Sequence, residues 1–162
     1  MGELAAKLAA LEGLIRGQLL DCEEMVPGSG YVTVTRRYMY AALHWCSTNH
    51  AAICDQVREL LGGGPFQMPA DSSVLADPDL AKNFETYWST PDVTAKDRMK
   101  LLRLAWDLLG SEFAGRHSQY EKFYAGPGFI MNLYSFLSCP WDELGEIVDG
   151  LMSGYDVEQA EI

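Results

Sequence analysis

The segment between Gly110 and Tyr124 carries an arginine, a histidine and several aromatic residues at spacings of three or four. Such spacing places side chains on one face of a helix. The residues that would share this face are Phe113, Arg116 or His117, Tyr120 and Tyr124. Small residues at Gly110, Ala114 and Gly115 leave the backbone nearly bare, so a flat ligand could approach closely. A fixed positive charge beside aromatic planes suits an anionic, planar cofactor such as a flavin nucleotide.

The polar residues of this segment also have simpler interpretations. Arg116 follows Glu112 by one helical turn and could form a surface ion pair instead of a contact to a flavin phosphate. His117 stands in the same relation to Glu121, and a role in proton transfer would require a partner base that the sequence does not locate. The two tyrosines suit packing, because tyrosine buries a ring while keeping one polar group.

The segment and the helix predicted before it resemble those of the reduced-flavin-dependent phenol monooxygenases. This family is typified by 4-hydroxyphenylacetate 3-monooxygenase and has relatives in pyoverdine-chromophore and enediyne biosynthesis. The matching residues read Arg98-Met-Lys-Leu-Leu-Arg-Leu-Ala-Trp-Asp107, followed by Gly110 to Tyr124. A looser likeness extends from about Leu8 to Met152. Family members are much longer, so the resemblance covers only the last part of their sequence.

The resemblance implies contacts to FAD by a continuous run of residues. They are Gly110, Ser111, Glu112, Phe113, Ala114, Gly115, Arg116 and His117. At Ala114 many relatives have a second glycine, and the methyl group could tighten the approach without removing the site. The family's phenol-binding and oxygen-activating residues lie upstream, so we expect no catalytic residue in this chain.

The resemblance also implies a function for the longer enzyme of which we expect this chain to be a C-terminal fragment. That enzyme would ortho-hydroxylate a phenol, either 4-hydroxyphenylacetate or a tyrosine-derived compound, with reduced FAD supplied by a separate flavin reductase. FAD would bind only together with the missing N-terminal part, so the chain alone should be inactive. We expect a homo-oligomer, a dimer or a tetramer. The alternative is a non-catalytic helical module for oligomerisation or interaction.

Length and composition agree with one domain spanning residues 1–162. A hydrophobic content of 48% in 162 residues is enough for a core. The net charge of -11 argues against nucleic acid and anionic membranes as partners, because both attract basic surfaces. No stretch is long and apolar enough for a membrane span, and the first residues do not have the pattern of a signal peptide. We therefore expect a cytoplasmic protein.

The cysteines are widely spaced and do not predict disulfides or a metal site. We interpret all four as reduced, buried thiols: Cys22, Cys46, Cys54 and Cys139. Cys46, His50 and Cys54 follow one another at steps of four residues. They would span about 12 Å along a helix, so all three cannot bind one metal ion.

Apolar periodicity predicts an all-α fold, and the resemblance implies a bundle like the C-terminal domain of acyl-CoA dehydrogenases. The predicted helices cover residues 3–25, 36–61 and 78–88, then one long helix from a cap at Thr94 through Gly110 to Pro127, and finally 128–137 and 140–152. Acidic residues after Leu20 disfavour a first helix that extends much beyond it. We expect an irregular loop at 65–77, whose 67–71 stretch could line a crevice beside a cofactor.

Two helices carry predicted core stripes. In the first helix the stripe consists of Leu4, Leu8, Leu11, Ile15 and Leu19. In the helix after Thr94 it consists of Leu101, Leu104, Ala105, Leu108 and Leu109. Spacings of three and four place each set on one side of its helix.

Overall fold

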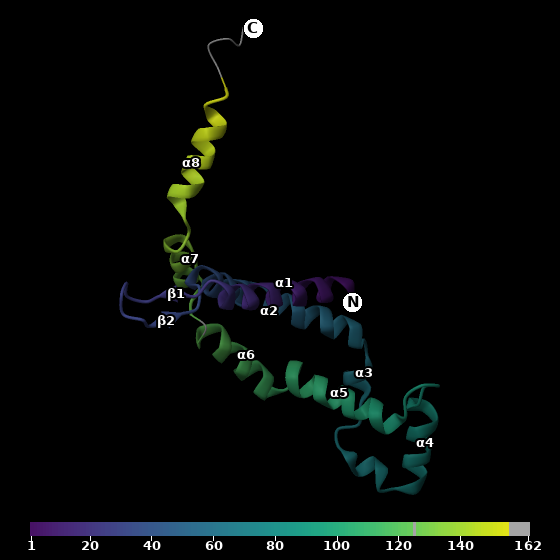
Figure 1. Cartoon of the computed structure of the whole chain (residues 1–162). Coiled ribbons are helices and arrows are strands. Elements are labelled where there is room, and N and C mark those ends of the chain that lie inside the picture. Colours follow the sequence, from purple (N-terminus) through teal and green to yellow (C-terminus); the bar gives the residue numbers. More distant parts are fainter. Residues whose placement is uncertain (125, 156–162) are drawn as a thin grey trace. The chain divides into compact units, whose positions relative to one another are not determined.

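The chain folds almost entirely into helices in the computed structural model, which describes residues 1–124 and 126–155. This agrees with the predicted all-α fold. The elements, shown in Figure 1, are α1 (Gly2–Leu20), β1 (Glu23–Glu24), β2 (Val32–Thr33), α2 (Arg36–Leu61), α3 (Gly64–Gln67), η1 (Ser72–Leu75), α4 (Pro78–Trp88), α5 (Ala95–Leu109), α6 (Glu112–Tyr124), α7 (Gly128–Leu137) and α8 (Trp141–Met152). Two compact units form, one from Met1–Trp45 with Gly128–Ile162 and one from Cys46–Pro127.

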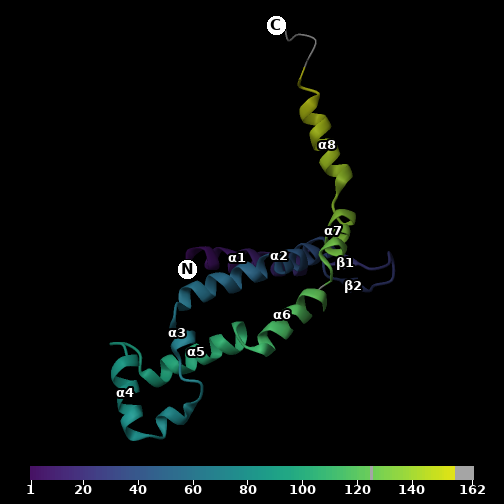
Figure 2. The same ribbon diagram turned by 180° about the vertical axis from the view of Figure 1, so that it is seen from behind.

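In the first unit, α1 runs alongside the beginning of α2, as Figures 1 and 2 both show. The half-buried side chains of α1 recur at steps of three and four: Leu4, Lys7, Leu11 and Leu14. Leu8, Ile15 and Leu19 of the predicted stripe are exposed, so that part of the prediction is wrong. The reason is that α1 has apolar residues on two faces, and the described part of the unit covers one of them.

α1 ends at Leu20, so the predicted helix over residues 3–25 is wrong at its C-terminal end, where the acidic residues already disfavoured it, and a small hairpin follows instead. β1 pairs with β2 in antiparallel orientation. The Glu24 carboxylate closes the turn by accepting hydrogen bonds from the backbone N–H groups of Gly28 (2.9 Å) and Gly30 (2.7 Å). Both glycines have positive φ angles of 82° and 74°, which disfavour other residues. The two N–H groups lower the pKa of Glu24 by stabilising its charged form.

α2 is one continuous helix that ends at the triple glycine, where Gly62 has a φ of 57°. The segment after it is not the irregular loop that we predicted, because it contains α3 and η1. Pro65 lies in the first turn of α3, where its fixed φ is favourable. The side chain of Asp71 caps η1 by accepting a hydrogen bond from the N–H of Ser73 at 2.7 Å.

The second unit has its core between α4 and α5, with η1 alongside. Phe84, Ala95 and Met99 are buried there, and the half-buried side chains of Met68, Leu75 and Trp88 pack around them. The two predicted helix starts are confirmed. The Asp77 side chain accepts from two backbone N–H groups of α4, and the Thr94 side chain accepts from one of α5.

The core stripe that we predicted for α5 is wrong for three of its five residues, and the other two, Ala105 and Leu109, are half-buried. Leu101, Leu104 and Leu108 are exposed, whereas the buried residues of this helix are Ala95, Met99 and Leu102. α5 is apolar around more than half of its circumference, and α4 covers the face that contains Ala95 and Met99. Periodicity alone could not show which face has a neighbour within the unit.

The first unit also contains α7 and α8. The ring of Tyr134 in α7 stacks on that of Tyr40 in α2, with centroids 4.8 Å apart. After α7, every residue of α8 is exposed. No helix in the described part of the chain is long and apolar enough to cross a membrane.

Candidate functional site

The predicted cofactor segment does not continue α5 as expected, because the chain turns at Gly110 and Ser111. α5 ends one residue before Gly110, and α6 begins directly after Ser111. The N–H groups of both turn residues donate to the carbonyl of Trp106, at 2.8 and 2.9 Å, which closes the last turn of α5. The Ser111 hydroxyl then accepts from the N–H of Ala114 at 3.0 Å and so starts the next helix.

Two further contacts fix this corner. A Cβ placed on Gly110 would lie 2.7 Å from a ring atom of Trp106, so the indole can lie there only because residue 110 has no side chain. Arg58 of α2 donates from Nη2 to the carbonyl of Leu109 at 2.6 Å and satisfies a carbonyl at the end of α5. No local sequence signal points to Arg58, because it lies 51 positions before its partner.

Gly115 and His117 line a hollow of about 370 Å³ between α2 and α6. Cys46 and His50 of α2 face the same space, and Lys122 of α6 also lines it. No heavy atom outside the helix lies within 4 Å of the position that a Cβ on Gly115 would occupy, so the helix surface is open there. The Glu121 carboxylate lines the hollow too, so the site carries one acidic group beside the two imidazoles and the ammonium group. The ammonium group, the imidazoles and the uncovered stretch of helix can receive a flat ligand that carries an anionic group.

The predicted aromatic face of α6 exists. The rings of Phe113 and His117 stack with centroids 5.9 Å apart, and those of Tyr120 and Tyr124 stack at 5.2 Å. Phe113 and both tyrosines are exposed, so within the described part of the chain they are not core residues. This face is available to a ligand or to another protein surface.

The ion pairs of the simpler interpretation are also present. Arg116 donates to one carboxylate oxygen of Glu112 through Nε (3.1 Å) and Nη2 (2.6 Å). Nε2 of His117 lies 3.8 Å from a carboxylate oxygen of Glu121. Both pairs are solvent-exposed, so the pair of Arg116 with Glu112 stabilises the helix by only about 0.3–0.5 kcal/mol, and the contact of His117 with Glu121 is an ion pair only when the imidazole is protonated. A phosphate group could therefore compete with Glu112 for the guanidinium.

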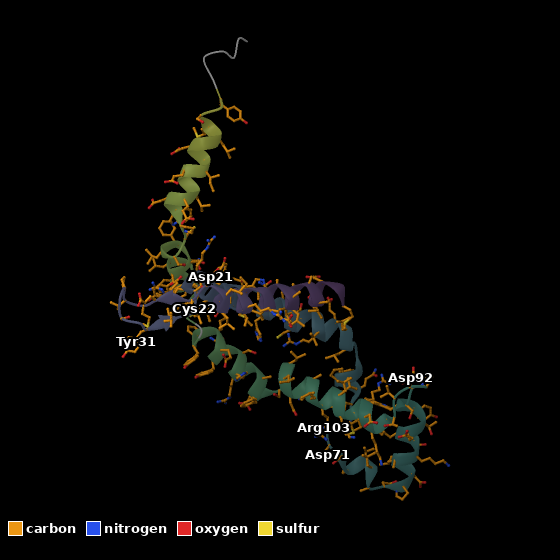
Figure 3. The ribbon with its side chains drawn as sticks, viewed as in Figure 1. Asp21, Cys22, Tyr31, Asp71, Asp92 and Arg103 are labelled. Carbon is orange, nitrogen blue, oxygen red and sulfur yellow. The ribbon has the colours of Figure 1, made fainter. Side chains whose placement is uncertain are left out.

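The predicted crevice beside residues 67–71 is present as a second hollow, of about 520 Å³. Residues of the 65–70 segment line it together with Arg103 and Trp106 of α5. Figure 3 labels Arg103 and, beside it in this view, Asp71. Because Trp106 also covers Gly110, this crevice borders the corner at which α6 begins. The presence of a cofactor beside this crevice stays a prediction.

The thiols offer little chemistry at this site. Burial raises the pKa of Cys46, so it is a neutral thiol and a poor nucleophile near pH 7. Cys54 Sγ lies 3.5 Å from Nε2 of His50. No group of three or more potential ligands could hold a metal ion within residues 1–124 and 126–155. All four thiols are free, as predicted, but the prediction that they are buried is wrong for Cys22, which is exposed beside the hairpin (Figure 3), and Cys46, Cys54 and Cys139 are only half-buried.

Similarity to known proteins assigns the family. A family model described as 4-hydroxyphenylacetate 3-hydroxylase C terminal (HpaB) matches residues 1–153. The pyoverdin chromophore biosynthetic protein PvcC of Pseudomonas aeruginosa is 32% identical over 130 residues, which are 78% of this chain and 25% of that protein. The oxygenase component of 4-nitrophenol 2-monooxygenase from a Rhodococcus species is 28% identical over 135 residues, covering 80% and 26% respectively.

A solved structure extends the likeness to three dimensions. The oxygenase component (HpaB) of 4-hydroxyphenylacetate 3-monooxygenase, complexed with FAD and 4-hydroxyphenylacetate, matches with a TM-score of 0.83 at 20% identity. The match covers 94% of this chain and 31% of that one, and it shows that the helical fold is shared. The chain spans about a quarter of the length of the curated relatives given above. It belongs to the family of 4-hydroxyphenylacetate 3-hydroxylase C-terminal domains.

Proposed function

We propose that residues 1–162 form one helical domain, the C-terminal flavin-contacting and oligomerisation domain of a two-component monooxygenase. The complete enzyme ortho-hydroxylates a phenol, 4-hydroxyphenylacetate or a tyrosine-derived compound, in the cytoplasm. A separate reductase supplies its reduced FAD. The main support for this proposal is that a chain of this family has a hollow lined by Gly115 and His117, two of the predicted cofactor-contact residues.

The residues of the hollow fit a flavin nucleotide. The open surface at Gly115 lets a flat ring approach the helix, which a side chain would prevent. Lys122 and the two imidazoles supply cationic or hydrogen-bonding groups for an anion. Arg116 does not line the hollow, but it lies one residue from Gly115, and its ion pair with Glu112 is exposed, so its side chain can turn toward a phosphate.

In this proposal the chain binds and orients, and bound FAD supplies the oxygen activation that hydroxylation requires. Gly115 provides the close approach, while Arg116 and Lys122 neutralise the phosphates. The corner formed by Trp106 and Gly110 determines where α6 begins, and it therefore sets the positions of Gly115, Arg116 and Lys122 along that helix. His117 keeps its ring orientation through the stacked ring of Phe113 and through Glu121.

The test uses the native polypeptide that carries this chain. We expect its intact mass to exceed 18.0 kDa and its purified form to quench FAD fluorescence. With reductase, FAD and a panel of phenols it should form catechols, whereas residues 1–162 alone should form none above a no-protein control. A native polypeptide that neither binds FAD nor forms a catechol would overturn the proposal, as would catechol formation by residues 1–162 alone.

A second candidate is a non-catalytic module for oligomerisation or interaction. Many large apolar side chains are exposed, which favours this candidate. They include all the large apolar residues of α8 and those on one face of α1. A visible absorption spectrum separates the two candidates. A flavin band that copurifies with the native polypeptide supports the first, and its absence after FAD saturation and gel filtration supports the second.

A further inference from the structure

The carbonyl group of Leu109, the last residue of α5, lies where the helix is interrupted. In an uninterrupted helix this carbonyl would accept a hydrogen bond from the N–H of Phe113, four residues later. Among the described residues no backbone N–H donates to it, and it accepts instead from Nη2 of Arg58 at 2.6 Å. The sequence pattern predicted one long helix through this point, whereas Figure 1 shows α5 and α6 as separate helices. The carbonyl that would join them is therefore held by a side chain of α2.

The residues after Leu109 allow a break in the helix but do not impose one. Gly110 and Ser111 are weaker helix formers than leucine or alanine, yet glycine and serine also occur inside helices. The Ser111 hydroxyl accepts from the N–H of Ala114, a cap that forms only once the chain has left α5. This stretch can therefore form one long helix or two shorter ones. A partner that removes an acceptor from the long helix decides between them.

Arg58 is well suited to hold this carbonyl. It lies in the last turn of α2 and reaches the end of α5, so its positive charge lies near the C-terminal ends of two helices, where the helix dipole favours a cation. Its neighbour Asp55 approaches Nη1 only to 3.9 Å, which leaves Nη2 to the carbonyl. A hydrogen bond from a charged guanidinium is also stronger than the neutral bond that the N–H of Phe113 would make.

We propose that Arg58 is a positioning residue for the flavin hollow, because its hold on the Leu109 carbonyl ends α5 and sets where α6 begins. Gly115 and His117 line the hollow from α6, and His50 lines it from α2, about two turns before Arg58. The Arg58 side chain thus links the two walls. Without it, α6 would continue α5, and its residues would no longer face His50. Arg58 itself does not line the hollow, so it acts through the backbone. Its effect on FAD rests on the proposed function.

The experiment compares Arg58→Met and Arg58→Lys with wild type in the native polypeptide. Hydrogen exchange is measured by mass spectrometry, without FAD, in peptides that cover residues 110–116. In Arg58→Met the N–H of Phe113 gains the Leu109 carbonyl, so its exchange should slow by about tenfold or more. FAD affinity, measured by fluorescence titration, should fall by about tenfold or more, because the two walls are no longer held in place. Lysine also donates to a carbonyl, and only Nη2 of Arg58 is used, so Arg58→Lys should keep both values within about threefold of wild type.

Arg98→Met is the matched control, because it removes the same kind of contact at the other end of α5. Arg98 donates from Nη1 to the carbonyl of Trp88, the last residue of α4, at 3.3 Å. This variant should keep wild-type exchange in residues 110–116 and wild-type FAD affinity. Circular dichroism checks that all variants fold, which we expect for Arg58→Met because the Arg58 side chain is 53% exposed.

Several results would overturn the role of Arg58. They are unchanged exchange in Arg58→Met, slowed exchange without a loss of FAD affinity, no recovery in Arg58→Lys, and an equal loss of FAD affinity in Arg98→Met. A loss of FAD affinity without slowed exchange also overturns it, because Arg58 would then contact the flavin directly. A native polypeptide that binds no FAD overturns the proposed function, whereas the exchange measurement alone then decides whether Arg58 ends α5.

Discussion

Replacing Gly110 with Ala should destabilise the corner between α5 and α6. The new Cβ would lie 2.7, 2.9 and 3.1 Å from three ring atoms of Trp106, so the indole must rotate or the corner must widen. Overpacking of this kind costs about 1–3 kcal/mol. The φ of Gly110 is -124°, which alanine can adopt without strain. Alanine also restricts the unfolded chain, which offsets about 0.4–1 kcal/mol of this destabilisation. We expect a net loss of about 1–2 kcal/mol.

Gly115→Ala is the matched control, because it makes the same chemical change five residues later. There a Cβ meets no heavy atom within 4 Å and lies inside α6. Alanine is favoured over glycine in a helix by about 0.5–1 kcal/mol, so this variant should be stabilised. The two substitutions should thus have effects of opposite sign on the free energy of unfolding.

Urea unfolding followed by circular dichroism measures both variants in the chain of residues 1–162. The double variant Gly110→Ala with Trp106→Leu should regain part of the lost stability, because the smaller side chain leaves room for the methyl group. The reasoning is refuted if Gly110→Ala is as stable as Gly115→Ala, or if removing the indole makes the Gly110→Ala protein still less stable.

Three other predictions concern charges and caps. Arg116→Ala should weaken FAD binding to the native polypeptide by about 1.5–3 kcal/mol, and Arg116→Lys should recover part of this; equal affinities in fluorescence titrations would remove Arg116 from the site. Thr94→Ala should cost about 0.5–2 kcal/mol in urea unfolding, because the N–H of Asp97 loses its acceptor at 3.1 Å, and an unchanged midpoint would contradict this. Because folding lowers the pKa of Glu24, its charged carboxylate stabilises the hairpin fully above the ordinary pKa of 4.5, and this stability is lost as pH falls through the lowered pKa of the folded state. Glu24→Gln should therefore flatten the acid dependence of amide exchange at Gly28 and Gly30.

Local signals in the sequence were enough to predict most of the long helices and several of their ends, but not α3, η1 or the break between α5 and α6. Asp77 and Thr94 were recognisable as caps because their side chains act on N–H groups two or three residues away. The carboxylates after Leu20 likewise predicted where α1 stops. The ion pair of Arg116 with Glu112 followed from helical spacing alone.

The features that the sequence could not provide depend on distant partners. The hollow at Gly115 requires His50 from α2, and the corner at Gly110 requires Arg58 and the indole of Trp106. The pair of Gly110 with a following serine was a visible signal for a helix break, but the continuing apolar pattern favoured one long helix. Buried faces were misassigned on α1 and α5 because both helices are apolar on more sides than their own unit covers.

The most direct test of the central claim is an FAD titration of the native polypeptide with Gly115→Leu. Leucine is a good helix former, its Cβ would meet no heavy atom within 4 Å, and its side chain would occupy part of the hollow beside His117. We expect FAD affinity to fall at least tenfold, which is about 1.4 kcal/mol, while the unfolding midpoint does not decrease. An unchanged FAD affinity in a folded Gly115→Leu protein would contradict the assignment of this hollow to the flavin.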